Sequence, residues 1–220
     1  MPFERSVMWP ETDVPEDYFI GVDLGQSQDY TAIVIMEGLV YRDHYKVTGL
    51  ERMRGISYPK IIKRVEDIVH SEPICWGNIH LVVDRTGVGR PIVDAMFVHD
   101  LNPVGVTITS GHAVTCEYLN QWKTRQARGV PKKDLMFNLA LMIQNGKLKV
   151  AQSLPLAQVL LTEMLSMTAK IDSRTGNDSY STGRESEHDD LTLALCLAAW
   201  WSQNKSKPTY PTPTIRTGIR

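Results

Sequence analysis

The chain has 220 residues, of which 42% are hydrophobic and 22% charged, and its 24 Lys and Arg nearly balance 25 Asp and Glu for a formal net charge of −1. This composition is typical of a globular protein that buries a core as one domain. It excludes a global positive field that would attract nucleic acid or a membrane surface, so any site for a polyanion must be a local patch.

The first segment carries no sign of a targeting or membrane sequence. Residues 1–17 are polar and hold three prolines, which predicts an irregular lead-in rather than a signal peptide. No apolar run reaches the roughly 18 residues that a membrane span needs. Cys75, Cys116 and Cys196 are far apart and odd in number, which favours reduced thiols over a disulfide framework or metal motif. We therefore expect a soluble cytoplasmic protein.

Regular structure begins with an apolar run from Tyr18 to Val22, which leads into Asp23. A second run follows from Tyr30 to Met36 after a short turn with Gly, Ser and Asp, and the pair predicts an antiparallel hairpin. An ionised Asp at the end of an apolar strand is partly desolvated, which is costly unless hydrogen bonds or a cation compensate. Asp23 is therefore either a hydrogen-bonded turn residue or a candidate ligand.

The next segments predict more sheet and a covering helix. Residues 39–48 alternate well enough for a third antiparallel strand. Between Tyr58 and His70, apolar residues recur on one face, which predicts an amphipathic helix that packs on the sheet.

A second apolar strand, from Ile79 to Asp84, also ends in an aspartate. A glycine turn, a helix that Pro91 opens and a strand from Val104 to Thr109 complete a βαβ pattern. The turn lacks the Gly-Lys-Ser/Thr of an ATP-binding loop and the spacing of a dinucleotide fingerprint, so we interpret it as a turn only. Asp84 either caps the helix or belongs to a site.

Helix and strand alternate over the following residues, and residues 121–133, at their start, carry five basic side chains. The predicted elements are a helix from Pro131 to Asn145, a short strand over 147–150, a helix that Pro155 opens, and an extended segment over 165–171.

The last part of the chain predicts a buried helix between two polar segments. Residues 172–183 are rich in turn formers and predict a mobile loop or hairpin tip. Asp189 and Asp190 lead into an apolar run from Leu191 to Trp201, where carboxylates at a helix start can act as caps. Residues 203–220 predict a disordered tail.

Three acidic positions thus stand at the ends of buried elements: Asp23, Asp84 and the pair Asp189 and Asp190. Neighbouring strand ends would bring these side chains together, and hard divalent cations would hold them there. Mg²⁺ prefers oxygen ligands and keeps part of its water shell, which suits a few carboxylates around an open site.

Three motifs in this order resemble the nuclease domain of the large terminase subunit of tailed bacteriophages. They are Gly21-Val-Asp-Leu-Gly25, Val82-Val-Asp-Arg-Thr-Gly-Val-Gly89 and His188-Asp-Asp-Leu-Thr-Leu-Ala-Leu195. The resemblance covers residues 18–202. It implies an α/β, ribonuclease H-like fold, related to Holliday-junction resolvases, whose mixed central sheet (an antiparallel hairpin, then βαβ) is flanked by helices.

The same resemblance implies an endonuclease that cuts double-stranded DNA with Mg²⁺ or Mn²⁺, two ions per site. Asp23, Asp84 and one or both of Asp189 and Asp190 would bind the metal, and we favour Asp190 as the catalytic member of the pair. The implied partners are an ATPase motor domain, a small terminase subunit and a portal, in the host cytoplasm. The chain has no P-loop motor, so we expect either a domain excised from a longer protein or a stand-alone relative that does not translocate DNA.

Six basic residues are predicted to contact DNA. Lys123, Arg125, Lys132 and Lys133 would lie along the phosphates and position the duplex without reading its sequence. Arg174 and Arg184 would reach phosphate from the segment over 172–187, which we interpret as a movable guard on the cleft. The alternative for residues 121–133 is a solvated loop followed by a helix start that does not contact DNA. The alternative for residues 172–187 is a surface loop without a role.

Other functions fit parts of the pattern. A resolvase would act as a dimer on branched DNA, and a nuclease-like scaffold would only bind DNA or a packaging partner, although the intact set of acids argues against the scaffold. An actin-like kinase has a similar first loop, but that fold needs two duplicated domains and a second Gly-rich loop.

Overall fold

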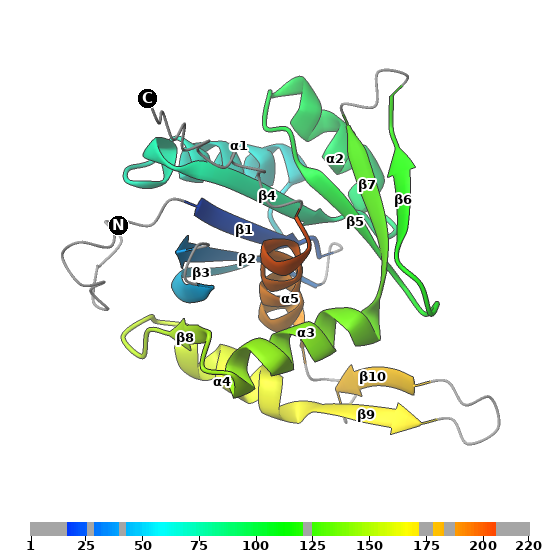
Figure 1. Ribbon diagram of the computed structural model, residues 1–220. Coiled ribbons are helices and arrows are strands. Elements are labelled where there is room, and N and C mark those ends of the chain that lie inside the picture. Colours follow the sequence, from blue (N-terminus) through cyan, green and yellow to red (C-terminus); the bar gives the residue numbers. More distant parts are fainter. Residues whose placement is uncertain are drawn as a thin grey trace, which may run out of the picture.

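An eight-stranded mixed sheet forms the centre of the molecule (Figure 1). The structure is a computed structural model that describes residues 17–25, 29–39, 43–120, 125–171, 178–182 and 188–205. The strand order is β6-β7-β5-β4-β1-β2-β3-β8, and β9 and β10 form a separate two-stranded sheet. This architecture confirms the predicted ribonuclease H-like α/β fold class.

The predicted first hairpin is confirmed. Strand β1 (Asp17–Asp23) pairs antiparallel with β2 (Tyr30–Leu39), and Asp23 lies opposite Ala32. The third strand, β3, spans His44–Arg54 rather than residues 39–48. The ten-residue β2 offers backbone partners along its whole length, so pairing extends β3 through residues 51–54, three of which are charged.

The parallel half of the sheet follows the predicted βαβ pattern. Strand β4 (Asn78–Asp84) pairs with β1 and with β5 (Val104–Thr109), and α2 (Gly89–Val98) connects them. Two further strands, β6 (Thr115–Tyr118) and β7 (Gln126–Pro131), extend the sheet. Six residues of the basic segment, Gln126–Pro131, therefore form strand β7, which pairs on both sides.

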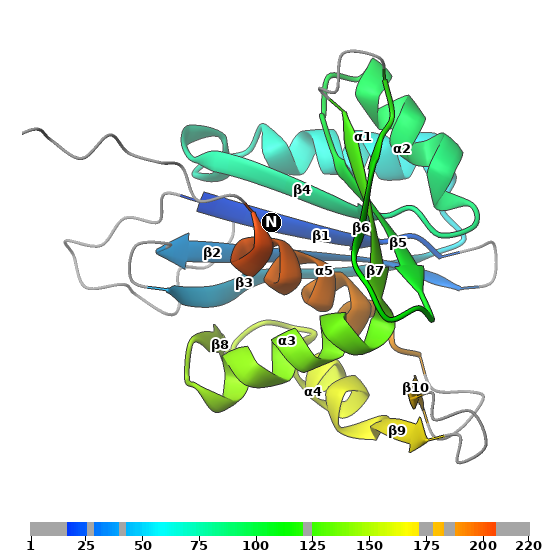
Figure 2. The ribbon, with the colours of Figure 1, turned by 45° about the vertical axis from the view of Figure 1, so that its right-hand side comes forward.

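Helices cover both faces of the sheet (Figures 1 and 2). Helix α1 (Tyr58–Val69) and α2 lie on one face, where α1 confirms the predicted amphipathic helix. Helix α5 (Asp190–Asn204) crosses the other face, with α3 (Lys132–Gln144) and α4 (Ala157–Ser166) outside it. All interior residues of α5 from Leu191 to Trp200 except Leu193 are buried, as its all-round apolar sequence predicts.

The remaining elements complete the described chain. They are a 3-10 turn η2 (Ile74–Trp76), β8 (Leu148–Val150), β9 (Met167–Ile171) and β10 (Asp178–Thr182). Strand β9 confirms the predicted extended segment. Strand β10 pairs antiparallel with it, which agrees with the hairpin alternative for residues 172–183 and places residues 178–182 in a strand. The other residues of the expected guard, the lead-in 1–16 and residues 206–220 lie outside the described residues.

The last helix is longer than its sequence predicts. Helix α5 continues to Asn204, two residues beyond its expected end, so the expected tail 203–220 starts too early. No helix among the described residues is long and apolar enough to cross a membrane.

Candidate active site

Asp23 and Asp84 stand side by side at the carboxyl ends of two neighbouring parallel strands. The register pairs Val22 of β1 with Val83 of β4, so the next residue of each strand is an aspartate. A hydrogen bond joins the two carboxyl groups. The prediction that they lie on adjacent strands is confirmed, and the two carboxyl groups are in contact.

The environment of Asp23 opposes its ionisation. Burial raises the pKa of this carboxyl well above its usual value, and the charges of Asp84, Asp190 and Asp189 raise it further. Burial also raises the pKa of Asp84, against two donors from Thr86 that hold its Oδ1 at 2.6 Å (hydroxyl) and 2.8 Å (backbone N–H). Ionisation of both carboxyl groups together is therefore favoured by a positive charge nearby.

Glycine at position 21 brings Asp190 to this strand end. A Cβ on Gly21 would lie 1.9 Å from the carbonyl oxygen of Ala194, so only glycine lets α5 rest directly on β1. Asp190 lies one helical turn before Ala194, and Asp23 lies two residues after Gly21 on the same face of the strand. The close approach thus places the first turn of α5 next to Asp23.

Arg52 on β3 holds the Asp190 carboxylate. Its Nη2 donates a hydrogen bond of 2.9 Å to Asp190 Oδ2. Ala32 pairs with Asp23 on one side and with Arg52 on the other, so both side chains project from the same face, two strands apart. Burial raises the pKa of Asp190, and the Arg52 guanidinium opposes that rise.

Glu163 on α4 is a further acid in this network, and the sequence analysis missed it. Its Oε2 accepts a hydrogen bond of 3.0 Å from the backbone N–H of Thr192, and its Oε1 lies 3.5 Å from Arg52 Nη1. Burial raises the pKa of Glu163 to about 7. Glu163 is the only acidic residue of the largely apolar helix α4, and this exception in the sequence could have indicated a buried functional carboxylate.

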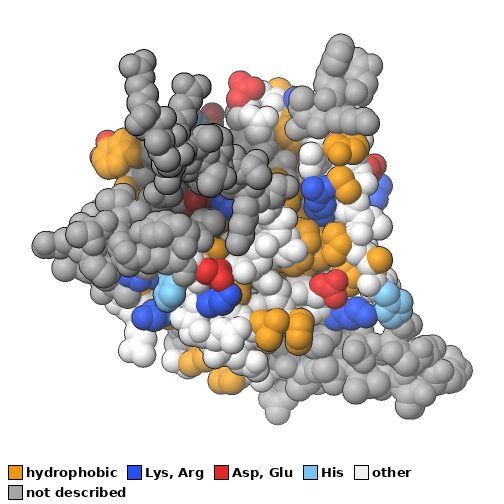
Figure 3. Space-filling view, in the orientation of Figure 1, with side chains coloured by type: hydrophobic (Ala, Val, Ile, Leu, Met, Phe, Trp, Pro, Cys, Tyr) orange, Lys and Arg blue, Asp and Glu red, His pale blue; other side chains and the backbone are white. Residues whose placement is uncertain are grey.

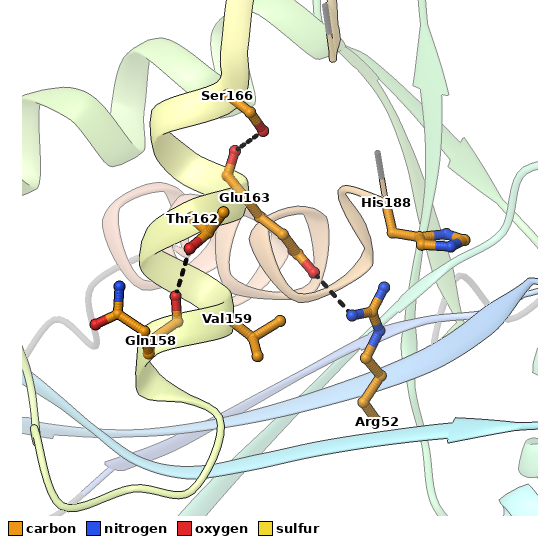
Figure 4. A pocket seen from close by; sticks show the side chains of 7 residues that line it. All are labelled: Arg52, Gln158, Val159, Thr162, Glu163, Ser166 and His188. Carbon is orange, nitrogen blue, oxygen red and sulfur yellow. Dashed lines mark hydrogen bonds and ion pairs between the residues drawn. The ribbon is translucent and has the colours of Figure 1, made fainter. Parts of the chain in front are cut away.

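A pocket of about 320 Å³ lies beside this network (Figure 4). Its lining residues are Arg52, Gln158, Val159, Thr162, Glu163, Ser166 and His188. The carbon Cζ of the Arg52 guanidinium lies 3.9 Å from the centroid of the Tyr30 ring, so this ring covers one face of the guanidinium.

Asp189 has its own basic partner. Lys132 Nζ, at the start of α3, donates a hydrogen bond of 2.9 Å to Asp189 Oδ2. The Lys132 charge also opposes the rise that burial causes in the pKa of Asp84. The structure therefore places Lys132, predicted as a DNA contact, among the acids, so that each acid at the start of α5 is paired with a base.

The other predicted DNA contacts lie apart from the acids or outside the described residues. Lys133 Nζ is 2.8 Å from His112 Nδ1, and the Arg125 guanidinium lies over the ring of Phe97 at 4.3 Å. Lys123, Arg174 and Arg184 are not among the described residues. On the face in Figure 3, the coloured basic and acidic side chains are interspersed, in keeping with a net charge of −1.

The donor set suits a hard divalent cation. Carboxylate oxygens are the ligands that Mg²⁺ and Mn²⁺ prefer, and a cation would relieve the repulsion that raises the pKa of Asp23. Within the described part of the chain, no three His, Cys, Asp or Glu side chains stand close enough to hold a metal together. Asp23 and Asp84 are in contact, whereas Arg52 and Lys132 hold Asp190 and Asp189.

Comparisons with known proteins agree with this geometry. The model of the terminase RNaseH-like domain matches residues 20–199. The large terminase nuclease from thermophilic phage G20c with bound magnesium has a TM-score of 0.60 and 22% identity, over 83% of this chain and 80% of that chain. No curated protein matches the chain.

Two more distant solved structures share the fold. The nuclease domain of the bacteriophage SPP1 large terminase with bound Mn has a TM-score of 0.51 and 13% identity, over 89% of this chain and 92% of that chain. The Mn-soaked, inhibitor-bound human cytomegalovirus terminase nuclease domain has a TM-score of 0.52 and 14% identity, over 85% and 83%.

Proposed function

The chain belongs to the family of terminase RNaseH-like domains, and from this premise we propose that it is a metal-dependent endonuclease that cuts double-stranded DNA in viral genome packaging. Its partners would be DNA, an ATPase motor domain, a small terminase subunit and a portal, in the host cytoplasm.

The contact between the Asp23 and Asp84 carboxyl groups carries the proposal. Buried Asp23 and half-buried Asp84 in contact, with two more acids near enough to raise the pKa of Asp23, are unfavourable for a fold that holds no cation there. Such a cluster is expected where phosphodiester chemistry needs a divalent ion. The solved terminase nuclease domains with bound magnesium or Mn support the same class of metal for this chain.

Asp23, Asp84 and Asp190 would hold Mg²⁺ or Mn²⁺, with Asp189 as a further ligand and two ions in the complete site. The chemistry supplied by such bound ions is activation of a water and stabilisation of the leaving oxygen of a phosphodiester. The chain fixes its side of the site in advance: Thr86 holds Asp84 Oδ1, and the Thr86 hydroxyl itself accepts the backbone N–H of Ile108 at 2.9 Å.

Cleavage of supercoiled plasmid tests the proposal. We expect nicked and linear products with Mg²⁺ or Mn²⁺ and none with EDTA. Asp23→Asn should abolish cleavage, whereas Asp67→Asn, which changes an exposed acid on α1, should not. Cleavage in EDTA, or equal cleavage by Asp23→Asn, would overturn the proposal. A four-way junction belongs in the assay, since strong preference for it would replace duplex cutting with junction resolution.

A further inference from the structure

Arg52 touches two acids that differ in role. One Nη donates to Asp190, a proposed metal ligand, at 2.9 Å. The other Nη lies 3.5 Å from Glu163, and Figure 4 shows this pair. The three side chains are 14%, 11% and 6% exposed, so the guanidinium is largely removed from water. A guanidinium in that position needs at least one carboxylate partner.

Glu163 keeps its place independently of Arg52. Its Oε2 accepts the backbone N–H of Thr192 at 3.0 Å and lies 3.4 Å from the Thr192 hydroxyl, which ties α4 to the first turn of α5. Its Oε1 is buried and has no hydrogen-bond partner among the described residues, and neither has Arg52 Nε. An acceptor therefore stands ready at a distance that Arg52 can close.

We propose that Glu163 is a positioning residue that retains the Arg52 guanidinium when Asp190 gives up that guanidinium to bind a cation. This inference rests on the proposed function, because it requires Asp190 to take a metal. Without Glu163, release of Asp190 would leave a buried guanidinium with no carboxylate, which is strongly unfavourable. Arg52 would then compete with the metal for Asp190.

The surroundings allow this exchange of partners. The pocket beside Arg52 and Glu163 gives the guanidinium room to turn toward Oε1 without displacing the core. The Tyr30 ring keeps its stacking surface on the guanidinium, which limits the change to a small rotation between the two acids that its Nη atoms face. Arg52 then acts as a resident counter-charge that Asp190 holds in the metal-free state and Glu163 holds in the metal-bound state.

The test is Mn²⁺ binding to the purified chain without DNA, measured by calorimetry above pH 7, where the Glu163 carboxyl is ionised. Glu163→Gln keeps an oxygen for Thr192 and removes the charge, and we expect it to raise the Kd for Mn²⁺ about tenfold. Arg52→Gln removes the competitor and should lower the Kd a few-fold. Glu66→Gln and Arg64→Gln on α1, whose side chains pair with Lys63 and Glu51 rather than with the acids of the site, are the matched controls.

The double variant separates this role from two simpler ones. With Arg52→Gln in place, Glu163→Gln should cause no further change, because Glu163 acts through Arg52. The same loss in both backgrounds would mean a direct pull of the Glu163 charge on the metal, and would overturn the proposal. An unchanged Kd of Glu163→Gln together with a lowered melting temperature would also overturn the proposal, because Glu163 would then only stabilise the start of α5 through Thr192. If Arg52→Gln weakens binding, Arg52 aids the metal and the inference fails even without a folded Glu163 variant. Absence of Mn²⁺ binding by the parent would instead contradict the proposed function.

Discussion

Gly21 lies against the carbonyl oxygen of Ala194, where a Cβ would approach to 1.9 Å. This contact between the central strand and the last helix decides where Asp190 stands relative to Asp23. The geometry of the site thus depends on the absence of a methyl group in the core, as well as on the acids themselves.

Gly21→Ala should therefore damage both fold and site. Because the clash is with backbone, α5 must shift, and overpacking of this kind costs about 1–3 kcal/mol of unfolding free energy. Cleavage should fall further than the stability loss explains, since Asp190 moves away from Asp23. Chemical unfolding and plasmid cleavage at a temperature where the variant is folded measure the two effects.

Gly111→Ala is the control for that experiment. Its Cβ would meet only Thr109 Oγ1, at an ordinary distance of 3.6 Å. A Gly21→Ala variant that behaves like Gly111→Ala in both assays would show that the helix position does not matter to the site.

Asp23→Asn should remove cleavage without lowering the metal-free melting temperature. The substitution deletes a buried carboxyl whose pKa is raised by burial and by three neighbouring acids, so the fold loses a source of repulsion. We expect an equal or higher melting temperature in EDTA and a smaller rise on addition of Mn²⁺ than in the parent. A clearly less stable protein in EDTA would argue that Asp23 serves the fold instead.

The pH dependence of stability should change in Glu163→Gln. Burial raises the pKa of this carboxyl from 4.5 to about 7, with Arg52 opposing the rise and the Asp190 charge adding to it. The folded state therefore holds the proton more tightly than the unfolded chain, and the parent loses stability as the pH rises from about 4.5 through about 7. Glutamine does not titrate.

Melting temperatures across that range check the sign. The difference between Glu163→Gln and the parent should move in favour of the variant as the pH rises, with a plateau above pH 7. Parallel curves for the two proteins would mean that Glu163 is ionised equally in both states.

Lys132 and Lys133 are neighbours in sequence with different expected roles. Lys132 pairs with Asp189, so Lys132→Gln should alter Mn²⁺ affinity even without DNA. Lys133 lies by His112, away from the acids, so Lys133→Gln should spare metal binding, weaken DNA binding, and lower the salt slope by about 1. Calorimetry and salt-dependent DNA binding distinguish them, and identical profiles would refute this division.

The predictable parts of the molecule are those with a strong local pattern. Apolar runs predicted the first hairpin, β4 and α5. An aspartate that follows the run of β1 or β4, or precedes the run of α5, indicated Asp23, Asp84 and Asp190 as site residues. These features can be predicted because the apolar run and the aspartate beside it are adjacent in the sequence.

The parts that escaped prediction depend on distant neighbours. Strand β7 (Gln-Ala-Arg-Gly-Val-Pro) has no run of β-branched residues, and it is extended because β5 and β6 pair with it on both sides. Arg52 meets Asp190 across 138 positions of sequence, and no local pattern indicates that pair. Lys132 looked like an open DNA contact because nothing near it in sequence reveals Asp189 as its partner.

Diffraction from crystals soaked in Mn²⁺ tests the central claim most directly, because the anomalous signal locates the metal and the refined coordinates name the liganding oxygens. We predict manganese bound by the carboxylates of Asp23, Asp84 and Asp190, with Arg52 turned toward Glu163. Manganese bound elsewhere, or a site at full Mn²⁺ occupancy that excludes Asp23, would contradict the account.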